Sequence, residues 1–282
     1  MKISVVTVSF NAEATIADAM ESVWRQDLPE GVELDYVVVD GLSKDRTVEK
    51  IKAFDAKVKA AGRTDFSFRW VSEKDKGLYD AMNKGVRMAS GEVVGVLNAD
   101  DMMNARDVIA NVSAYYAQQP ELEFLYSDVR FVAQTARLDQ LNETDTKRYV
   151  CPRFWQPWML TFGYAPPHPG MYVRKSCFER WGYYKYEYRI GADYEMTVRF
   201  VRKLRARRKY MNKCVVAMRL GGESTKKGNA GSFVGNNYDV INANRENGYW
   251  GSKWLILGKL PIKVLEVLVP KFWRRIGAVG GW

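Results

Sequence analysis

The sequence predicts an α/β protein whose mostly parallel sheet is flanked by helices. Three observations lead to this prediction. Over the first 120 residues, apolar β-branched runs alternate with segments whose apolar residues recur at helical spacing. The run at residues 37–39 is continuously apolar, as in a strand that is buried on both faces. Polar residues also follow each strand-like run at its carboxyl end.

The elements follow one another in a regular order. Strands are expected at residues 3–10, 34–40, 66–72 and 91–97. Helices are expected at Ala14–Gln26, Thr47–Ala60, Leu78–Ala89 and Asp107–Gln118. After about Pro120 the pattern changes to short strands and a Pro-rich aromatic loop within residues 121–175, and a helix is expected from Tyr194 to about Leu204.

Composition narrows the class of protein. The chain has 282 residues, of which 47% are hydrophobic and 27% charged, which is typical of one large folded domain or two fused halves. The cysteines are odd in number and no C-x-x-C occurs, so neither a disulfide framework nor a thiolate zinc site is expected. With His168 as the single histidine, a metal would need oxygen ligands, which favours Mg²⁺ or Mn²⁺.

Positive charge is concentrated in two segments. The net charge is +10, and residues 198–213 hold eight basic side chains and no acidic one. Residues 250–282 combine six basic side chains with several Trp and Phe, which is typical of a segment that lies on an anionic membrane. The alternative is a tail packed on its own domain with solvated lysines. No nucleic-acid recognition motif accompanies the charge, so no nucleic-acid partner is expected, and neither a signal peptide nor a spanning helix is expected.

Polar side chains stand where the four expected strands end: Ser9 and Asn11, Asp40, Asp75, and Asn98 to Asp101. Ligands of open α/β sheets bind outside the carboxyl ends of the strands, so we expect these residues at one rim. Asp100 and Asp101 repel each other as anions, and a divalent cation would remove that repulsion. The alternative is that one of them caps the following helix.

Further candidates lie in the second half of the chain. Asp193, just before a helix, is a candidate general base that would deprotonate an attacking hydroxyl, with simple helix capping as the alternative and Glu195 as the neighbouring candidate. His168 could contact substrate or hold a loop, and Lys84 could meet phosphates or be solvated. No G-x-G-x-x-G follows the first strand, and GGESTKKG at residues 221–228 lacks the P-loop spacing.

Four blocks of sequence resemble those of a family 2 glycosyltransferase with the GT-A fold, of the bacterial cell-surface polysaccharide type. They are SVVTVSFNAEATIADAMESVWRQ, VVVDGLSKDRT, SEKDKGLYDAMNKGVRMASGEVVGVLNADD and PPHPGMYVRKSCFERWGYYKYEYRIGADYEM. The blocks occur in the family's order and cover most of residues 1–200. One difference from the family's pattern stands at the first acidic position of the metal motif, which is Asn98 here.

The resemblance implies a role for each matching residue. Thr7, Ser9 and Asn11 would line the nucleotide pocket, and Asp40 would meet the base or ribose. Asp75, Gly77, Asp80 and Lys84 would shape the donor side. Asn98, Ala99, Asp100 and Asp101 would form the D-x-D-type motif that contacts the nucleotide sugar and, through Asp100 and Asp101, the metal. Asp193 would be the catalytic base, with His168 and Glu195 near the acceptor.

The expected activity is inverting transfer of a sugar from a nucleoside diphosphate sugar, a UDP-sugar, to a saccharide or lipid-linked saccharide, with Mn²⁺ or Mg²⁺ as cofactor. The expected organisation is a nucleotide-sugar-binding half at 1–120, an acceptor and catalytic-base half at 121–229, and a C-terminal basic and aromatic amphipathic tail at 230–282. That tail would hold the protein at the inner face of the cytoplasmic membrane. Two alternatives are a non-catalytic membrane-docked scaffold and a metal-dependent nucleotidyltransferase.

Overall fold

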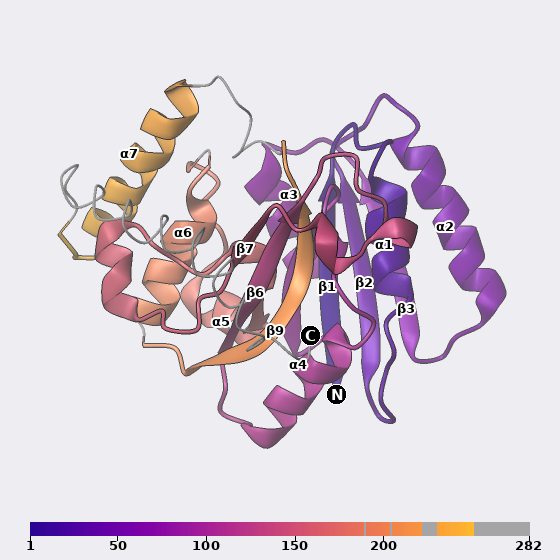
Figure 1. Ribbon diagram of the computed structural model, residues 1–282, viewed down its shortest axis with the longest axis horizontal. Coiled ribbons are helices and arrows are strands. Elements are labelled where there is room, and N and C mark those ends of the chain that lie inside the picture. The colour runs from indigo at the N-terminus through magenta and orange to yellow at the C-terminus, as the bar shows by residue number, and fades with distance from the viewer. Residues whose placement is uncertain (189, 204, 222–229, 251–282) are drawn as a thin grey trace.

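The computed structural model describes residues 1–188, 190–203, 205–221 and 230–250. Its centre is a nine-stranded mixed sheet with helices on both faces (Figure 1). The sheet order is β3-β2-β1-β4-β8-β6-β9-β5, and β7 pairs with β6 beside this path. The strands are β1 (Lys2–Ser9), β2 (Glu33–Asp40), β3 (Phe66–Ser72), β4 (Val93–Asn98), β5 (Met102–Met103), β6 (Phe124–Val132), β7 (Arg148–Val150), β8 (Met171–Arg174) and β9 (Arg208–Arg219).

Two hydrophobic cores lie on the two faces of the sheet. One packs α1, α2 and α4 against β1 and β2, and the other packs α3, α5 and α6 against the opposite face. The α-helices are α1 (Ile16–Trp24), α2 (Thr47–Ala61), α3 (Leu78–Met88), α4 (Val108–Gln118), α5 (Lys175–Trp181), α6 (Ala192–Thr197) and α7 (Ala230–Glu246). Short 3₁₀ turns are η1 (Leu138–Gln140), η2 (Glu143–Asp145), η3 (Pro157–Phe162) and η4 (His168–Gly170).

The four parallel strands β3, β2, β1 and β4 form the first half of the sheet, as the sequence predicts. Ser9 of β1 is level with Asp40 of β2, which is level with Ser72 of β3. Asn98 at the end of β4 is level with the residue that precedes Ser9. The carboxyl ends of all four strands therefore lie at one edge.

The second half of the chain extends the same sheet. β8 runs antiparallel to both β4 and β6, and β9 runs parallel to β6. β9 then reaches back to pair with β5, directly after β4. The predicted division at residue 120 thus falls between parts that share one sheet, and β9 brings residues from the end of the chain to the edge formed by the first four strands.

α3 lies unusually close to the sheet because of Gly85. A Cβ at this position would stand 2.2 Å from Cγ1 of Val6 in the buried strand β1. Because Val6 belongs to the packed core and cannot move aside, only glycine permits this approach. The close packing fixes the first turn of α3 at the edge where the strands end.

The expected helix from Tyr194 to about Leu204 is present in two parts. α6 covers the first part and continues as a π-helical segment, η5 (Val198–Lys203). α7 packs against α6, with Val240, Ile241 and Ala243 buried, so residues 230–250 belong to the folded body rather than to a free tail. Residues 251–282, on which the predicted amphipathic tail mainly falls, lie outside the described residues. Within the described residues, no helix combines the length and apolar character needed to cross a bilayer.

Candidate active site

The ends of β1, β2 and β3 are tied together by Asp40. Its carboxylate is buried and accepts hydrogen bonds from the hydroxyls of Ser9 (3.1 Å), Ser43 and Ser72 (2.7 Å), and from the backbone N–H of Ser43 (3.0 Å). The structure therefore supports a role for Asp40 in ordering the strand ends. Contact of Asp40 with a nucleotide stays a prediction, because its oxygens are already occupied by these donors.

The loop after β1 lies beside the loop after β2. Asn11 has a left-handed backbone (φ 48°), receives the backbone N–H of Lys44 on its side-chain oxygen, and donates its own N–H to Ser43. Asn11 is exposed at the edge, as a contact to a ligand requires. Thr7 is fully buried inside the sheet, where its hydroxyl accepts a hydrogen bond from Tyr36, so the structure does not bring it to the edge.

The segment after β3 closes onto the N-terminus of α3. Asp75 accepts the backbone N–H of Gly77 (2.8 Å), and Asp80 accepts that of Lys76 (3.0 Å). Lys84 forms an ion pair with Glu73 (2.8 Å) and a longer contact with Asp80 (3.9 Å). Open space surrounds Gly77, but its backbone adopts φ 118°, a conformation that a non-glycine residue would not tolerate. These residues lie together, as expected, although Lys84 is ion-paired rather than solvated.

The loop after β4 is anchored to the end of β9 by Arg219. The buried guanidinium donates to the carbonyl oxygen of Asp100 (2.9 Å) and pairs with Asp18 of α1 (2.5 Å). Asp101 accepts the backbone N–H of Arg219 (3.3 Å) and the side-chain amide of Asn98 (3.1 Å). α4 begins only at Val108, after β5, so neither aspartate caps it.

Burial raises the pKa of Asp100, and it raises the pKa of Asp101 well above the usual range with a further contribution from the charge of Asp100. The two neighbouring carboxylates thus repel each other as anions, and a bound cation would offset that repulsion. Asn98 adds a buried side-chain oxygen without a hydrogen-bond partner. Carboxylate and amide oxygens are ligands that suit Mg²⁺ or Mn²⁺.

These three residues therefore fit a divalent cation in chemistry. They do not make a complete cage, because within the described residues no group of three or more His, Cys, Asp and Glu side chains lies together. The remaining positions of such a cation would fall to oxygens of a ligand. Asp100 is half-buried, whereas Asp101 is 1% exposed and turned toward Asn98 and Arg219. Asp100 is therefore the more accessible of the two aspartates.

Asp193 lies in the first turn of α6, and its side chain is half-buried. One of its oxygens, Oδ1, lies 3.1 Å from the hydroxyl of Tyr79 in the first turn of α3, and that hydroxyl also donates to the carbonyl oxygen of Ile190. Within the described residues no donor is bound to the other oxygen. Since α3 follows directly from the Asp75 segment, this hydrogen bond brings the second half of the chain to the predicted donor edge.

A second group of side chains flanks Asp193. His168 is buried and shares a hydrogen bond with the hydroxyl of Tyr184 (2.8 Å), whose ring is stacked on that of Tyr79. Burial lowers the pKa of His168, although the nearby charge of Asp193 raises it. The side-chain amide of Asn83 holds Tyr184 in place, because it donates to the backbone carbonyl oxygen of Tyr184 and accepts the backbone N–H of the same residue. A neutral His168 therefore lies beside Asp193.

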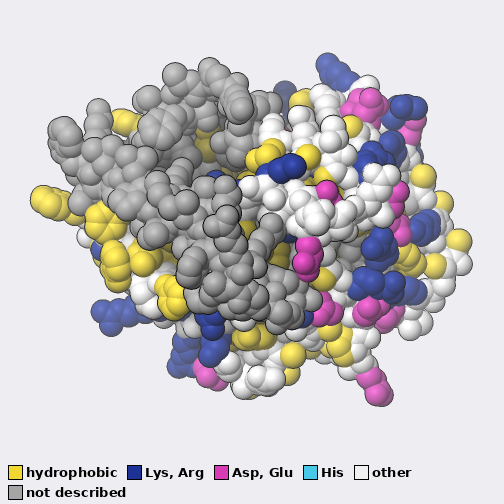
Figure 2. Space-filling view, viewed as in Figure 1, with side chains coloured by type: hydrophobic (Ala, Val, Ile, Leu, Met, Phe, Trp, Pro, Cys, Tyr) yellow, Lys and Arg dark blue, Asp and Glu magenta, His cyan; other side chains and the backbone are white. Residues whose placement is uncertain are grey.

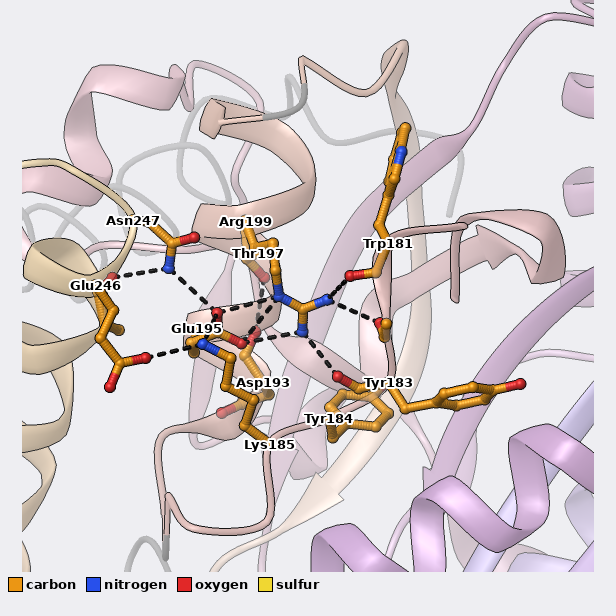
Figure 3. Close-up of polar contacts among 12 residues, drawn as sticks. Trp181, Tyr183, Tyr184, Lys185, Asp193, Glu195, Thr197, Arg199, Glu246 and Asn247 are labelled. Carbon is orange, nitrogen blue, oxygen red and sulfur yellow. Dashed lines mark hydrogen bonds and ion pairs between the residues drawn. The ribbon is translucent and has the colours of Figure 1, made fainter. Parts of the chain in front are cut away.

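Glu195 occupies a different environment (Figure 3). Its carboxylate is 0% exposed and receives donors from Arg199 (3.0 Å), Lys185 (3.2 Å) and Asn247 (3.1 Å). Arg199 also donates to the carbonyl oxygens of three consecutive residues, 181–183. The network joins α6, η5, the segment before α6 and the residue after α7. Glu195 therefore has no free oxygen for an acceptor, and Asp193 is the carboxylate available to act as a base.

Sequence reasoning missed the side chains that position these acids. Tyr79 and Asn83 lie within the GLYDAMNKG segment, but their partners, Asp193 in α6 and Tyr184 before it, are 100 residues or more away in sequence. Arg219 lies 118 residues after Asp101. The order of the sequence carries no signal for such pairings, and each forms only when β9 and α6 return to the edge of the sheet.

Comparisons with known proteins identify the family of the chain. Residues 4–153 match the profile of "Glycosyl transferase family 2". The chain is 27% identical over 199 residues to a PGL/p-HBAD biosynthesis glycosyltransferase of Mycobacterium bovis, covering 70% of this chain and 68% of that protein. It is 29% identical over 198 residues to an uncharacterized glycosyltransferase of Mycobacterium tuberculosis, with the same coverages.

Two solved structures have a similar fold. S. aureus TarS, in complex with UDP-GlcNAc, superposes with a TM-score of 0.60 at 18% identity over 88% of this chain, which spans 65% of the TarS chain. Glucosyl-3-phosphoglycerate synthase from Mycobacterium tuberculosis, in complex with Mn²⁺, UDP and phosphoglyceric acid, gives a TM-score of 0.57 at 15% identity over 88% of this chain and 79% of that one. Both support the GT-A architecture. With more than half of its length matching the family profile, the chain belongs to glycosyl transferase family 2.

Proposed function

We propose that this chain transfers a sugar, with inversion, from a UDP-sugar to a hydroxyl of a saccharide or lipid-linked saccharide in cell-surface polysaccharide or lipopolysaccharide biosynthesis. The observation that carries the proposal is the placement of Asp193. It is an accessible carboxylate on α6, bound to Tyr79 at the edge where the parallel strands end. The structural relatives bound to UDP-GlcNAc and to UDP with Mn²⁺ support the choice of donor class.

In the proposed reaction, the free oxygen of Asp193 takes the proton of the acceptor hydroxyl. The acceptor oxygen forms a bond to the anomeric carbon as the bond from that carbon to the diphosphate breaks, and the electron pair leaves with the diphosphate. A single displacement inverts the anomeric centre. Tyr79, whose hydroxyl lies between the other carboxylate oxygen and the carbonyl oxygen of Ile190, would help to orient Asp193 toward the acceptor. His168, buried and neutral beside it, is proposed to border the acceptor.

The donor would lie across the strand ends, between the Asn11 loop and the segment that contains Asp75, Gly77, Asp80 and Lys84. Asp100 and Asp101, with Asn98, would hold the Mn²⁺ or Mg²⁺ ion, and Asp100 is its most accessible ligand. When bound, the cation would neutralise negative charge on the leaving diphosphate. Arg219 and Asp101 keep the Asp100 loop in place.

The test of the base is Asp193→Asn, with Glu187→Gln, an exposed acid just before α6, as control. We expect Asp193→Asn to bind UDP with unchanged affinity in calorimetry and to lose about 10²–10⁴-fold in transfer rate. Transfer at the rate of the unchanged protein would remove Asp193 from the role of base. Release of UDP from any UDP-sugar would also decide against the alternative of a non-catalytic scaffold.

The test of the cation is UDP binding with and without Mn²⁺. We expect Mn²⁺ to strengthen UDP binding in the unchanged protein, and Asp100→Asn to abolish that gain while keeping the fold. If Asp100→Asn responds to Mn²⁺ as the unchanged protein does, the assignment of Asp100 is wrong. We also propose that the protein acts at the inner face of the cytoplasmic membrane, on the basis of the basic and aromatic composition of residues 250–282.

A further inference from the structure

A cavity of about 520 Å³ opens between the start of β9 and the loop after β7. Its lining combines three cations, Arg153, Arg208 and Lys209, with the aromatic rings of Phe154, Trp155 and Tyr210. Within the described part of the chain none of these cations pairs with a carboxylate, whereas Arg199 and Lys213 from the same basic run do. The cavity therefore carries an excess of positive charge.

Two large aromatic side chains project beside the cavity. Phe154 is 78% exposed, and Trp158 of η3 is 57% exposed with its ring edge-on to Phe162. Together with Arg153, Arg208 and Lys209 they form what we call the cationic–aromatic surface. Figure 2 shows hydrophobic and cationic side chains gathered next to each other at the lower left, where β9 begins in Figure 1. Exposed aromatic rings interleaved with Lys and Arg are typical of surfaces that enter the headgroup region of a membrane.

The buried acid Asp128 contacts the lining of the cavity without forming an ion pair with its cations. Asp128 is 2% exposed and accepts hydrogen bonds from the hydroxyls of Tyr149 and Tyr210 at 2.7 Å each. Its charge acts on Arg153 through space, so it offsets part of the positive charge. Arg208 and Lys209 add further positive charge to the same cavity.

We propose that the cationic–aromatic surface docks on a bilayer that contains anionic lipids, with a lipid phosphate in the cavity and Phe154 and Trp158 among the headgroups. The inference rests on the proposed action at the membrane and deepens it, because it assigns a contact in the folded body that is separate from the C-terminal tail. A membrane fits better than a nucleic acid, since Trp158 packs edge-on against Phe162 within η3 and is not arranged as a stacking platform.

The position of this surface suits a lipid-linked acceptor. The carbonyl oxygen of Leu160 in η3 accepts hydrogen bonds from the hydroxyl of Tyr194 and from the amide of Asn244 (3.2 Å). Tyr194 follows Asp193 on α6, so η3 is joined directly to the helix that carries the proposed base. A bilayer on this surface would therefore contact an element that is hydrogen-bonded to the helix of Asp193.

The test is co-sedimentation of the full chain with vesicles of phosphatidylcholine, with or without phosphatidylglycerol. One variant neutralises the cavity (Arg153→Gln, Arg208→Gln, Lys209→Gln), and its matched control neutralises three exposed lysines of α2 (Lys52→Gln, Lys57→Gln, Lys59→Gln). Each cation near an anionic bilayer contributes roughly a fivefold factor, so we expect the cavity variant to partition roughly a hundredfold more weakly onto anionic vesicles. We expect the control to lose far less, although its net charge changes equally.

A second variant, Phe154→Ser with Trp158→Ser, should also weaken vesicle binding. It tests the docking proposal by itself if the cavity variant fails to fold. UDP binding is measured on every variant, because loss of docking with intact UDP binding separates this inference from the proposed reaction. Anionic vesicles that bind the cavity and aromatic variants as tightly as the unchanged chain would overturn the proposal. Binding of a labelled single-stranded RNA that depends on the same residues, without vesicle binding, would overturn it in favour of a nucleic-acid surface.

Discussion

Replacing Glu195 by Gln keeps the size of the side chain and removes its charge from the network of Figure 3. The guanidinium of Arg199 is nearly buried, and Glu195 is its only carboxylate partner among the described residues. Removing one member of a buried ion pair leaves the other charge without compensation, which costs about 3–5 kcal/mol. Lys185 is more exposed and keeps Glu246 as a partner at 2.8 Å, so its contribution is small. We therefore expect Glu195→Gln to lower the free energy of unfolding by about 3–5 kcal/mol.

The assay is urea unfolding followed by tryptophan fluorescence, because the protein contains nine tryptophans. Arg199→Met should destabilise as well, and the double variant Glu195→Gln with Arg199→Met should cost less than the two single changes added together, since neither charge is then left alone. Glu187→Gln, which changes an exposed acid eight residues earlier, serves as the control and should alter the free energy by less than about 0.5 kcal/mol.

One result would contradict a purely structural role for Glu195. If Glu195→Gln unfolds at the same urea concentration as the unchanged protein but raises KM for the acceptor, Glu195 contacts the acceptor and the structural interpretation of the network is wrong. That outcome would restore the role that the sequence suggested for Glu195. A fall in stability with unchanged KM supports the network.

Three further predictions follow from the geometry. Burial raises the pKa of Asp128 from 3.8 to about 6, so the folded state retains a proton that the unfolded state has already released between these values. The free energy of unfolding should fall by about 2 kcal/mol as pH rises from about 4 to about 6, and urea titrations across this range should show that Asp128→Asn loses this dependence. Gly85→Ala places a Cβ 2.2 Å from Cγ1 of Val6 and should cost about 1–3 kcal/mol in the same unfolding assay, where an unchanged midpoint would contradict the close packing of α3. Arg219→Lys cannot reproduce the contacts of the guanidinium with the Asp100 loop and should weaken Mn²⁺-dependent UDP binding about 10–100-fold by calorimetry, with equal affinity as the contrary result.

The parallel half of the sheet was predictable because its strands are short apolar runs separated by amphipathic helices. The expected strand at residues 34–40 and the observed β2 (Glu33–Asp40) differ by one residue, and the expected edge of polar residues is present. β9 was not predictable in the same way. Its first residues, RKYMNK, belong to a uniformly basic run with no alternation, and they form a strand because β6 offers a partner. The π-helical continuation of α6 likewise has no local signal in the sequence.

The candidate site was predictable as a set of acids, but the sequence did not separate the roles within each pair. Asp100 and Asp101 are adjacent, and Asp193 and Glu195 are two residues apart. Composition and spacing alone therefore do not show which member of each pair contacts a ligand. On an α-helix, side chains two residues apart point about 200° away from each other around the axis. If one of them faces the edge of the sheet, the other must face the interior of the protein.

In both pairs one acid is more deeply buried than the other, and this difference in burial separates their roles. Asp101 and Glu195 are fully enclosed. Asp101 receives the backbone N–H of Arg219, which is distant in sequence, and Glu195 receives the guanidinium of Arg199, which lies four residues later on the same helical segment. A carboxylate that accepts such donors holds its loop or helix in a fixed place. Glu195 has no oxygen left for a ligand, whereas each oxygen of Asp101 accepts a single donor and can still contact a cation beside Asp100. Asp100 and Asp193 stay half-buried and are the more accessible acids of the two pairs. The inner acid of each pair thus fixes the position of the outer one, and a substitution of Glu195 should impair the site through stability and placement rather than through chemistry.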